Sequence, residues 1–133
     1  MKFGEEPMDQ KKPIIWIGSS KKDFMEFPHE VRNEMGHALY IAQKGDKHRD
    51  AKPLKGFGGS SVLEIVQSDG KGTYRTVYTV QMEEAVVVLH AFQKKSKTGI
   101  KTPKQDIDLV EQRLKSAHQK YREWLTTVKK EVN

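Results

Sequence analysis

The spacing of apolar residues divides the chain into segments with a helical period and segments with a strand period. In the first half, apolar residues recur every three or four positions, which is the period of one face of an amphipathic helix. They are Phe24, Phe27, Val31, Met35, Ala38, Leu39 and Ala42. Pro28 suits the first helical position, and Gly45 suits the residue that follows a helix. The pattern predicts a helix that begins near Phe24 and ends before Gly45.

Three later segments are rich in β-branched and aromatic residues and predict strands at Val62–Gln67, Thr73–Val80 and Ala85–Phe92. The connections SDGKG and QMEE between them are short, and such connections force neighbouring strands to run antiparallel. A short β-favouring run at Ile14–Ile17 suits an edge strand, whereas the glycine-rich segment Gly45–Gly59 predicts a loop. We therefore expect an antiparallel sheet of three to four strands.

A second long helix is predicted near the end of the chain. Thr102, Pro103 and Gln105 form the pattern of a capping box with proline at the first helical position. The apolar stripe that follows consists of Ile107, Val110, Leu114, Ala117, Tyr121, Leu125 and Val128. The expected fold class is α+β, with an N-terminal helix, the antiparallel sheet and a C-terminal helix. We expect residues 1–13 to form a flexible leader and residues 14–133 to form a single domain.

Composition narrows the class of protein. The 133 residues carry 24 lysines and arginines against 18 aspartates and glutamates, a net charge of +6 that favours an anionic partner such as nucleic acid. The absence of cysteine excludes disulfides, thiolate metal ligands and a cysteine nucleophile. The longest apolar run, Ala85–Leu89, is far shorter than the roughly 20 residues of a membrane span. We expect a cytoplasmic protein with no membrane association.

The most informative segment is His90–Lys104, where an apolar strand runs into five lysines with no acidic residue among them. A polyphosphate ligand would balance the repulsion between clustered cations, so the segment points to RNA. Lys94, Lys95 and Lys97 directly follow the strand, which would position at least the first of them. The alternative for such a run is a solvated surface.

Two further residues are candidates for chemistry. Loop lengths place Arg75 between Ile65 and His90 on one face of the sheet, where its guanidinium could hold a phosphate through two hydrogen bonds. The alternative is an ion pair with Glu64 or with another acid on the sheet. His90 titrates near neutrality and suits a general acid or base, or else a buried structural residue. The histidines share no ligand spacing, so we expect no metal and no cofactor.

These residues fall in motifs that occur in a known order: PLKGFG, VLEI, GTYRTVYTV, VVVLHAFQKKS and KTP. Together with the helix FPHEVRNEMGHALYIAQKG, they resemble the phage-derived branch of the RelE/HigB toxin family over roughly Ile14 to Leu125. The resemblance implies a RelE-like fold and the toxin of a type II toxin–antitoxin pair. Such toxins are endoribonucleases that cleave messenger RNA, commonly on the ribosome, and thereby inhibit translation.

The resemblance also implies a mechanism and partners. The ribose 2′-hydroxyl attacks the adjacent phosphate without metal, leaving a cyclic phosphate and a 5′-hydroxyl. The catalytic residues would be Arg75 of the YR motif with Lys94 and Lys95 of the FQKK motif. The RNA-binding residues would be Lys55, Lys97, Lys101 and His90. The expected partners are messenger RNA, the ribosome and a helix-turn-helix antitoxin, with oligomers formed only through that antitoxin.

Two alternatives to this function remain open at the level of the sequence. One is a non-enzymatic RNA-binding regulatory module that uses the same basic residues. The other is an inactive remnant of a prophage toxin. The endoribonuclease and the binding module both predict an affinity for RNA that falls as the salt concentration rises. Only cleavage products therefore distinguish the enzyme from the module.

Overall fold

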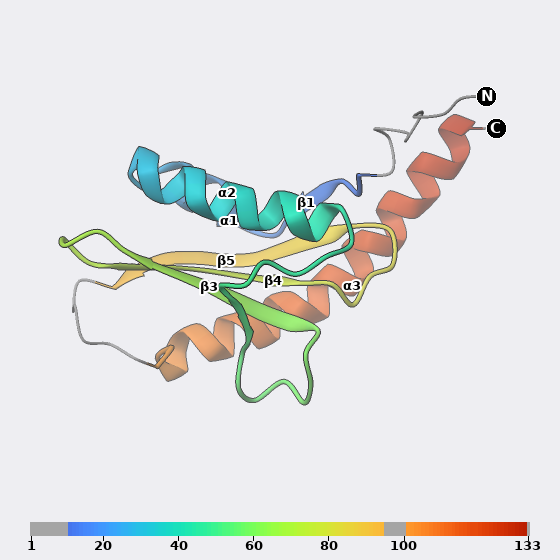
Figure 1. Ribbon diagram of the computed structural model, residues 1–133. Helices are drawn as coiled ribbons and strands as arrows, with labels where there is room; N and C mark the ends of the chain where they lie inside the picture. The colour runs from blue at the N-terminus through green and yellow to red at the C-terminus, as the bar shows by residue number, and fades with distance from the viewer. Residues whose placement is uncertain (1–10, 95–100, 133) are drawn as a thin grey trace, which may run out of the picture.

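The computed structural model describes residues 11–94 and 101–132, the last four of these through the backbone alone. Its elements in chain order are β1 (Ile14–Trp16), α1 (Ser20–Met25), α2 (His29–Gln43), β2 (Ala51–Pro53), β3 (Val62–Ser68), β4 (Thr73–Thr79), β5 (Val86–Lys94) and α3 (Lys104–Val132). Helices α1 and α2 cover one face of the sheet, and α3 crosses the other (Figure 1). The predicted α+β class is confirmed.

The sheet differs from the prediction in strand number and direction. It has five strands in the order β1-β5-β4-β3-β2. The additional strand β2 falls within the predicted loop, where Ala51–Pro53 pairs antiparallel with Leu63–Ile65. Strand β1 runs parallel to β5, because the two helices carry the chain across the sheet before the strands of the main hairpins begin. The sheet is therefore mixed rather than wholly antiparallel.

Both faces of the central strands are buried, which divides the hydrophobic core into two layers. On the α2 side, Met35 and Leu39 pack with Ile65 and Tyr78. On the α3 side, the sheet packs against Val110 and Ala117, with Tyr121 and Trp124 partly buried further along the helix. Every residue of β4 is buried. Strand β4 therefore lacks a solvent-facing row, and any charged side chain on it needs a partner inside the fold.

The predicted N-terminal helix is two helices separated by a turn. Phe24 and Phe27 are both buried, and their rings lie 5.8 Å apart, so the turn keeps two anchors on the core. Pro28 is the residue before α2 rather than its first helical residue. Gly45 follows α2 as predicted, with φ +92°. In the described part of the chain, no helix is both long and apolar enough to span a membrane.

Candidate functional site

Strand register determines which face carries Arg75. It lies opposite Val66 of β3 and Phe92 of β5. The prediction that Ile65 and His90 lie directly opposite Arg75 is wrong, and Ile65 lies on the other face of the sheet. His90 remains on the same face as Arg75, because it lies opposite Val77, two residues further along β4.

Two turns and a bulge explain the register. The predicted alignment of Arg75 with Ile65 requires Gln67 to lie opposite Thr73, but the SDGKG turn pairs Ser68 with Thr73, so β3 is shifted by one residue. The QMEE connection shifts β5 by one residue, so that Thr79 lies opposite Val87, and a bulge that skips Leu89 of β5 adds a second shift between Val77 and Tyr78. Periodicity alone specifies neither the turn closure nor the bulge.

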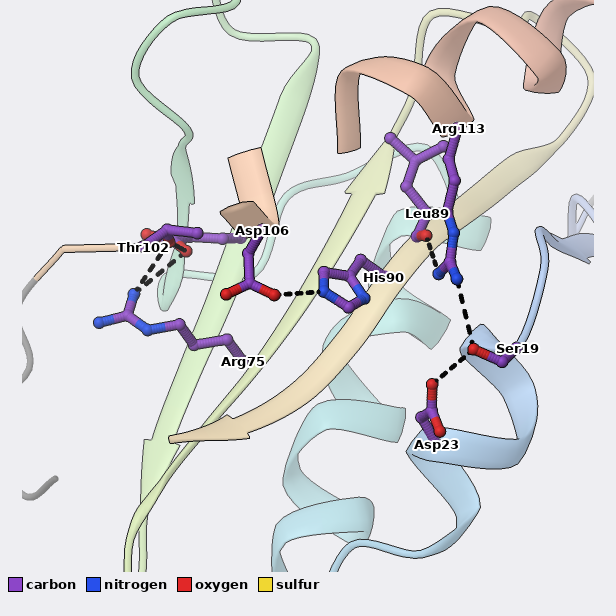
Figure 2. A network of polar contacts seen from close by, with 9 residues as sticks. Ser19, Asp23, Arg75, Leu89, His90, Thr102, Asp106 and Arg113 are labelled. Carbon is purple, nitrogen blue, oxygen red and sulfur yellow. Dashed lines mark hydrogen bonds and ion pairs between the residues drawn. The ribbon is translucent and has the colours of Figure 1, made fainter. Parts of the chain in front are cut away.

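Arg75 is the buried centre of a polar network on the α3 side. Only 2% of it is exposed, and its Nη1 donates to Glu64 Oε2 at 3.1 Å. The ion pair with Glu64, which was the alternative at the sequence level, is therefore present. Thr102 Oγ1 donates to the same carboxylate oxygen at 2.8 Å and lies 3.5 Å from Arg75 Nη1. The network joins the middle of the sheet to the segment that leads into α3 (Figure 2).

The use of Thr102 in this network replaces the predicted capping box. Helix α3 begins at Lys104, and the amides of Asp106 and Ile107 donate to the carbonyl of Pro103. The Thr102 hydroxyl is directed to Glu64 instead of the first turn of the helix. A hydrogen bond to a half-buried carboxylate is stronger than the hydrogen bond of a threonine hydroxyl to a backbone amide at a helix N-terminus. The tertiary contact therefore determines where this side chain points.

A cationic cleft lies directly above the network. It has a volume of about 360 Å³ and is lined by Lys52, Lys55, Lys101, Glu64 and Thr102, together with Pro53, Leu54 and Ile107. Strand β2 places Lys52 opposite Glu64. The structure thus brings together two of the predicted RNA-binding residues, Lys55 and Lys101. Lys52 was missed because its segment was interpreted as a loop; its spacing of three from Lys55 was the available signal.

The remaining predicted lysines lie at or beyond the end of β5. Lys94 is opposite Thr73 and shares the sheet face of Arg75. Lys95 and Lys97 lie outside the described residues. The catalytic roles predicted for Arg75, Lys94 and Lys95 therefore stay predictions, with Arg75 placed beneath the floor of the cleft.

His90 lies apart from the cationic cleft. Its Nε2 is 2.7 Å from Asp106 Oδ1 of α3, and its ring stacks on Phe92 at 4.6 Å between centroids. Burial lowers the pKa of His90, against the opposing effect of the hydrogen bond and charge of Asp106. Arg113 also lowers this pKa and Asp23 raises it, each through its charge. The RNA contact predicted for His90 stays a prediction, and the structure gives this side chain a different cleft.

A second polar contact fixes α3 to the start of α1. Arg113 Nη1 donates to the carbonyl of Leu89 at 2.9 Å, and its Nη2 donates to Ser19 Oγ at 3.3 Å. Ser19 in turn donates to Asp23 at 2.7 Å. Gly18 allows this approach, because a Cβ there would lie 3.0 Å from the guanidinium. Figure 2 shows Arg113 between Leu89 and Ser19. The sequence did not single out Arg113, because it is one of many charged residues in the segment that forms α3.

The fold and the cleft define a small α+β protein with a cleft lined by lysines. Among the residues that the structure describes, no three histidine, aspartate or glutamate side chains gather closely enough to hold a metal ion. A family model described as "Phage derived protein Gp49-like (DUF891)" matches residues 22–115. The chain belongs to this Gp49-like, phage-derived family, which confirms the phage-derived branch indicated by the motifs.

No curated protein matches the chain by sequence. Three solved structures are similar to it in fold. A chain of the toxin–antitoxin complex RelBE2 of Mycobacterium tuberculosis is 16% identical, with 65% of this chain and 94% of that chain covered and a TM-score of 0.42. A doubly substituted RelE toxin of E. coli in the free state is 17% identical, with 61% and 81% covered and a TM-score of 0.45. The isolated E. coli RelE toxin is 18% identical, with 76% and 97% covered and a TM-score of 0.48.

Proposed function

We propose that this protein is the toxin of a type II toxin–antitoxin pair and an endoribonuclease that cleaves messenger RNA where it is translated. The observation that carries the proposal is the cleft formed by Lys52, Lys55 and Lys101 above the Arg75 network. Its lysines come from β2, from the segment after it and from the segment before α3. Cations converging from separate parts of the chain are typical of a phosphate site rather than of a solvated run.

The proposed reaction is a transfer of one phosphodiester within the RNA. The ribose 2′-oxygen loses its proton and attacks the adjacent phosphorus, and the bond from phosphorus to the 5′-oxygen breaks. The leaving 5′-oxygen takes up a proton, so the products are a 2′,3′-cyclic phosphate and a 5′-hydroxyl. The chain's part is to orient the phosphate for in-line attack and to stabilise the charge that develops on it. The cationic side chains of lysine and arginine can supply both functions.

The residues have distinct parts in this scheme. Lys55, Lys101 and Lys52 hold the RNA backbone in the cleft. Arg75 neutralises Glu64 beneath the cleft, so that the carboxylate does not repel the phosphate, and it supports the developing charge from below. Lys94 and Lys95 are the candidates for proton transfer at the end of β5, with Lys97 as a further backbone contact. The expected partner is a helix-turn-helix antitoxin that covers this basic face.

Purified protein incubated with RNA, alone and on translating ribosomes, tests the proposal. We expect fragments that end in a cyclic phosphate. Lys55→Ala and Lys101→Ala should each reduce the cleavage rate, because each removes one of the cations that face the cleft. Lys120→Ala removes an exposed lysine of α3 outside the cleft and should cleave like the wild type.

The other outcomes separate the alternatives. Salt-sensitive RNA binding that Lys55→Ala weakens, with intact RNA under every condition, would favour the non-enzymatic binding module. Neither binding nor cleavage by a folded protein would favour the inactive remnant. Cleavage that is equally fast in the wild type and the Lys55→Ala and Lys101→Ala variants would contradict the assignment of the cleft.

A further inference from the structure

A second cleft lies between the end of α1 and the C-terminal half of β5. It has a volume of about 360 Å³ and is lined by Asp23, Glu26 and Phe27 on one side and by His90, Phe92 and Gln93 on the other. Strand β1 pairs only with Val86–Val88, whereas β5 continues to Lys94. The cleft thus lies beside the part of β5 that extends past β1.

His90 brings an unused hydrogen-bond acceptor to this cleft. Asp106 accepts a hydrogen bond from Nε2, so the neutral ring carries its proton there and leaves a lone pair on Nδ1. The residue is only 7% exposed, and Nδ1 is buried with no hydrogen-bond partner among the described residues. In Figure 2 this nitrogen is directed away from Asp106, on the side where α1 carries Asp23. A buried acceptor of this kind favours a ligand that donates a hydrogen bond.

The charge of the cleft specifies the ligand further. Its lining includes the carboxylates of Asp23 and Glu26 and no lysine or arginine, although the whole chain has a net charge of +6. The nearest cation described above, Arg113, donates its hydrogen bonds to Leu89 and Ser19 instead. Two carboxylates at one cleft repel a phosphate backbone and attract a cation.

We propose that this cleft binds an arginine side chain of a partner protein. The guanidinium donates to Nδ1 of His90 and to the carboxylates of Asp23 and Glu26, and it stacks beside the ring of Phe92. Arginine fits better than lysine, because its planar fork presents several donors at once and packs against aromatic faces. The cleft is acidic, which favours a protein over a nucleic acid as the source of the ligand. Identifying the partner as the antitoxin rests on the proposed function.

The tautomer of His90 and the binding of a ligand to its ring can be measured directly on the intact protein by ¹⁵N NMR of the imidazole. We expect a signal typical of a proton on Nε2 and a bare Nδ1. Addition of Nα-acetyl-arginine methylamide should shift the Nδ1 signal in a saturable manner. The matched citrulline compound has the same length without the charge and should bind about tenfold more weakly or worse.

Substitutions at the carboxylates provide the second readout. Asp23→Asn and Glu26→Gln should each weaken the arginine compound about tenfold, whereas Glu83→Gln, at an exposed acid outside the cleft, should leave its affinity unchanged. A proton on Nδ1 in the free protein would overturn the proposal. Equal binding of the citrulline compound or the absence of a saturable shift would also overturn it. So would a shift with cytidine, a nucleic-acid probe, in the absence of a shift with the arginine compound.

This test is independent of RNA cleavage. It uses no RNA, so a protein that fails to cleave can still bind the arginine compound. Conversely, a protein that cleaves RNA but shows no response at His90 would retain the proposed function and lose the arginine site. Cleavage by Asp23→Asn and Glu26→Gln should match the wild type, because neither residue lines the cationic cleft.

Discussion

Removing the guanidinium of Arg75 should destabilise the fold by leaving the Glu64 carboxylate without its cation. The Glu64 side chain is only 16% exposed, and Arg75 Nη1 lies 3.1 Å from its Oε2. Deleting one partner of a buried ion pair costs about 3–5 kcal/mol, because the remaining charge stays desolvated. Thr102 still donates a hydrogen bond to the carboxylate. We therefore expect Arg75→Met to lower the free energy of unfolding by about 3 kcal/mol, the lower end of that range.

Urea denaturation of single and double variants measures this effect. Adding Glu64→Gln to Arg75→Met removes the stranded charge and keeps an acceptor for Thr102, so the double variant should recover at least about half of the loss. Lys120→Met changes an exposed residue and should shift the free energy of unfolding by less than about 0.5 kcal/mol. A loss below about 1 kcal/mol for Arg75→Met would contradict a stabilising role of the ion pair, and so would a double variant no more stable than Arg75→Met alone.

Three further predictions concern the contacts that hold α3 and α1 on the sheet. Burial lowers the pKa of His90 below its ordinary 6.5, so the unfolded chain takes up the proton first as the pH falls. His90 thus contributes stability above about pH 6.5, and this stability is lost as the pH falls toward the folded pKa. His90→Gln should therefore reduce the slope of the urea midpoint against pH in that range. Thr102→Val removes a hydrogen bond to a carboxylate and should cost about 1.5 kcal/mol or more, with Thr102→Ser close to wild type in the same assay. Gly18→Ala should lower the melting temperature more than Gly45→Ala, because both glycines have positive φ but only at Gly18 would a Cβ approach Arg113; equal losses would contradict the contact.

The helices and the three main strands could be predicted because their periods are set by burial. Met35 and Leu39 repeat at helical spacing because one face of α2 packs on the sheet. The strand Ala51–Pro53 could not be predicted in the same way. It has three residues, it lies within the glycine-containing segment Gly45–Gly59, and only its pairing with β3 makes it a strand. Very short edge strands carry too few positions for a period to be detected.

The sequence predicts which residue types form the candidate site, but it does not predict which residues they contact. The lysines near Lys101 and the guanidinium of Arg75 are visible as charges in segments that favour strands and loops. Whether Arg75 faces Glu64 depends on the SDGKG turn, which pairs Ser68 rather than Gln67 with Thr73, and whether it shares a face with His90 depends on the register of β5, which includes a bulge. Each of these moves side chains between faces at little cost in local propensity. The face is therefore decided by tertiary packing.

The positions of the two clefts separate opposite charges across the sheet. The cationic cleft lies at the β2 edge, with Lys52 and Lys55, and the acidic cleft lies beside β5 and α1, with Asp23 and Glu26. The segment before α3 and its first turn contact both clefts, because Thr102 binds Glu64 and Asp106 binds His90. The proposed partner arginine would therefore contact a histidine that is held by the first turn of α3, the helix that begins shortly after Lys101. The two clefts have no lining residue in common, so we expect a partner arginine at the acidic cleft to leave the cationic cleft itself uncovered.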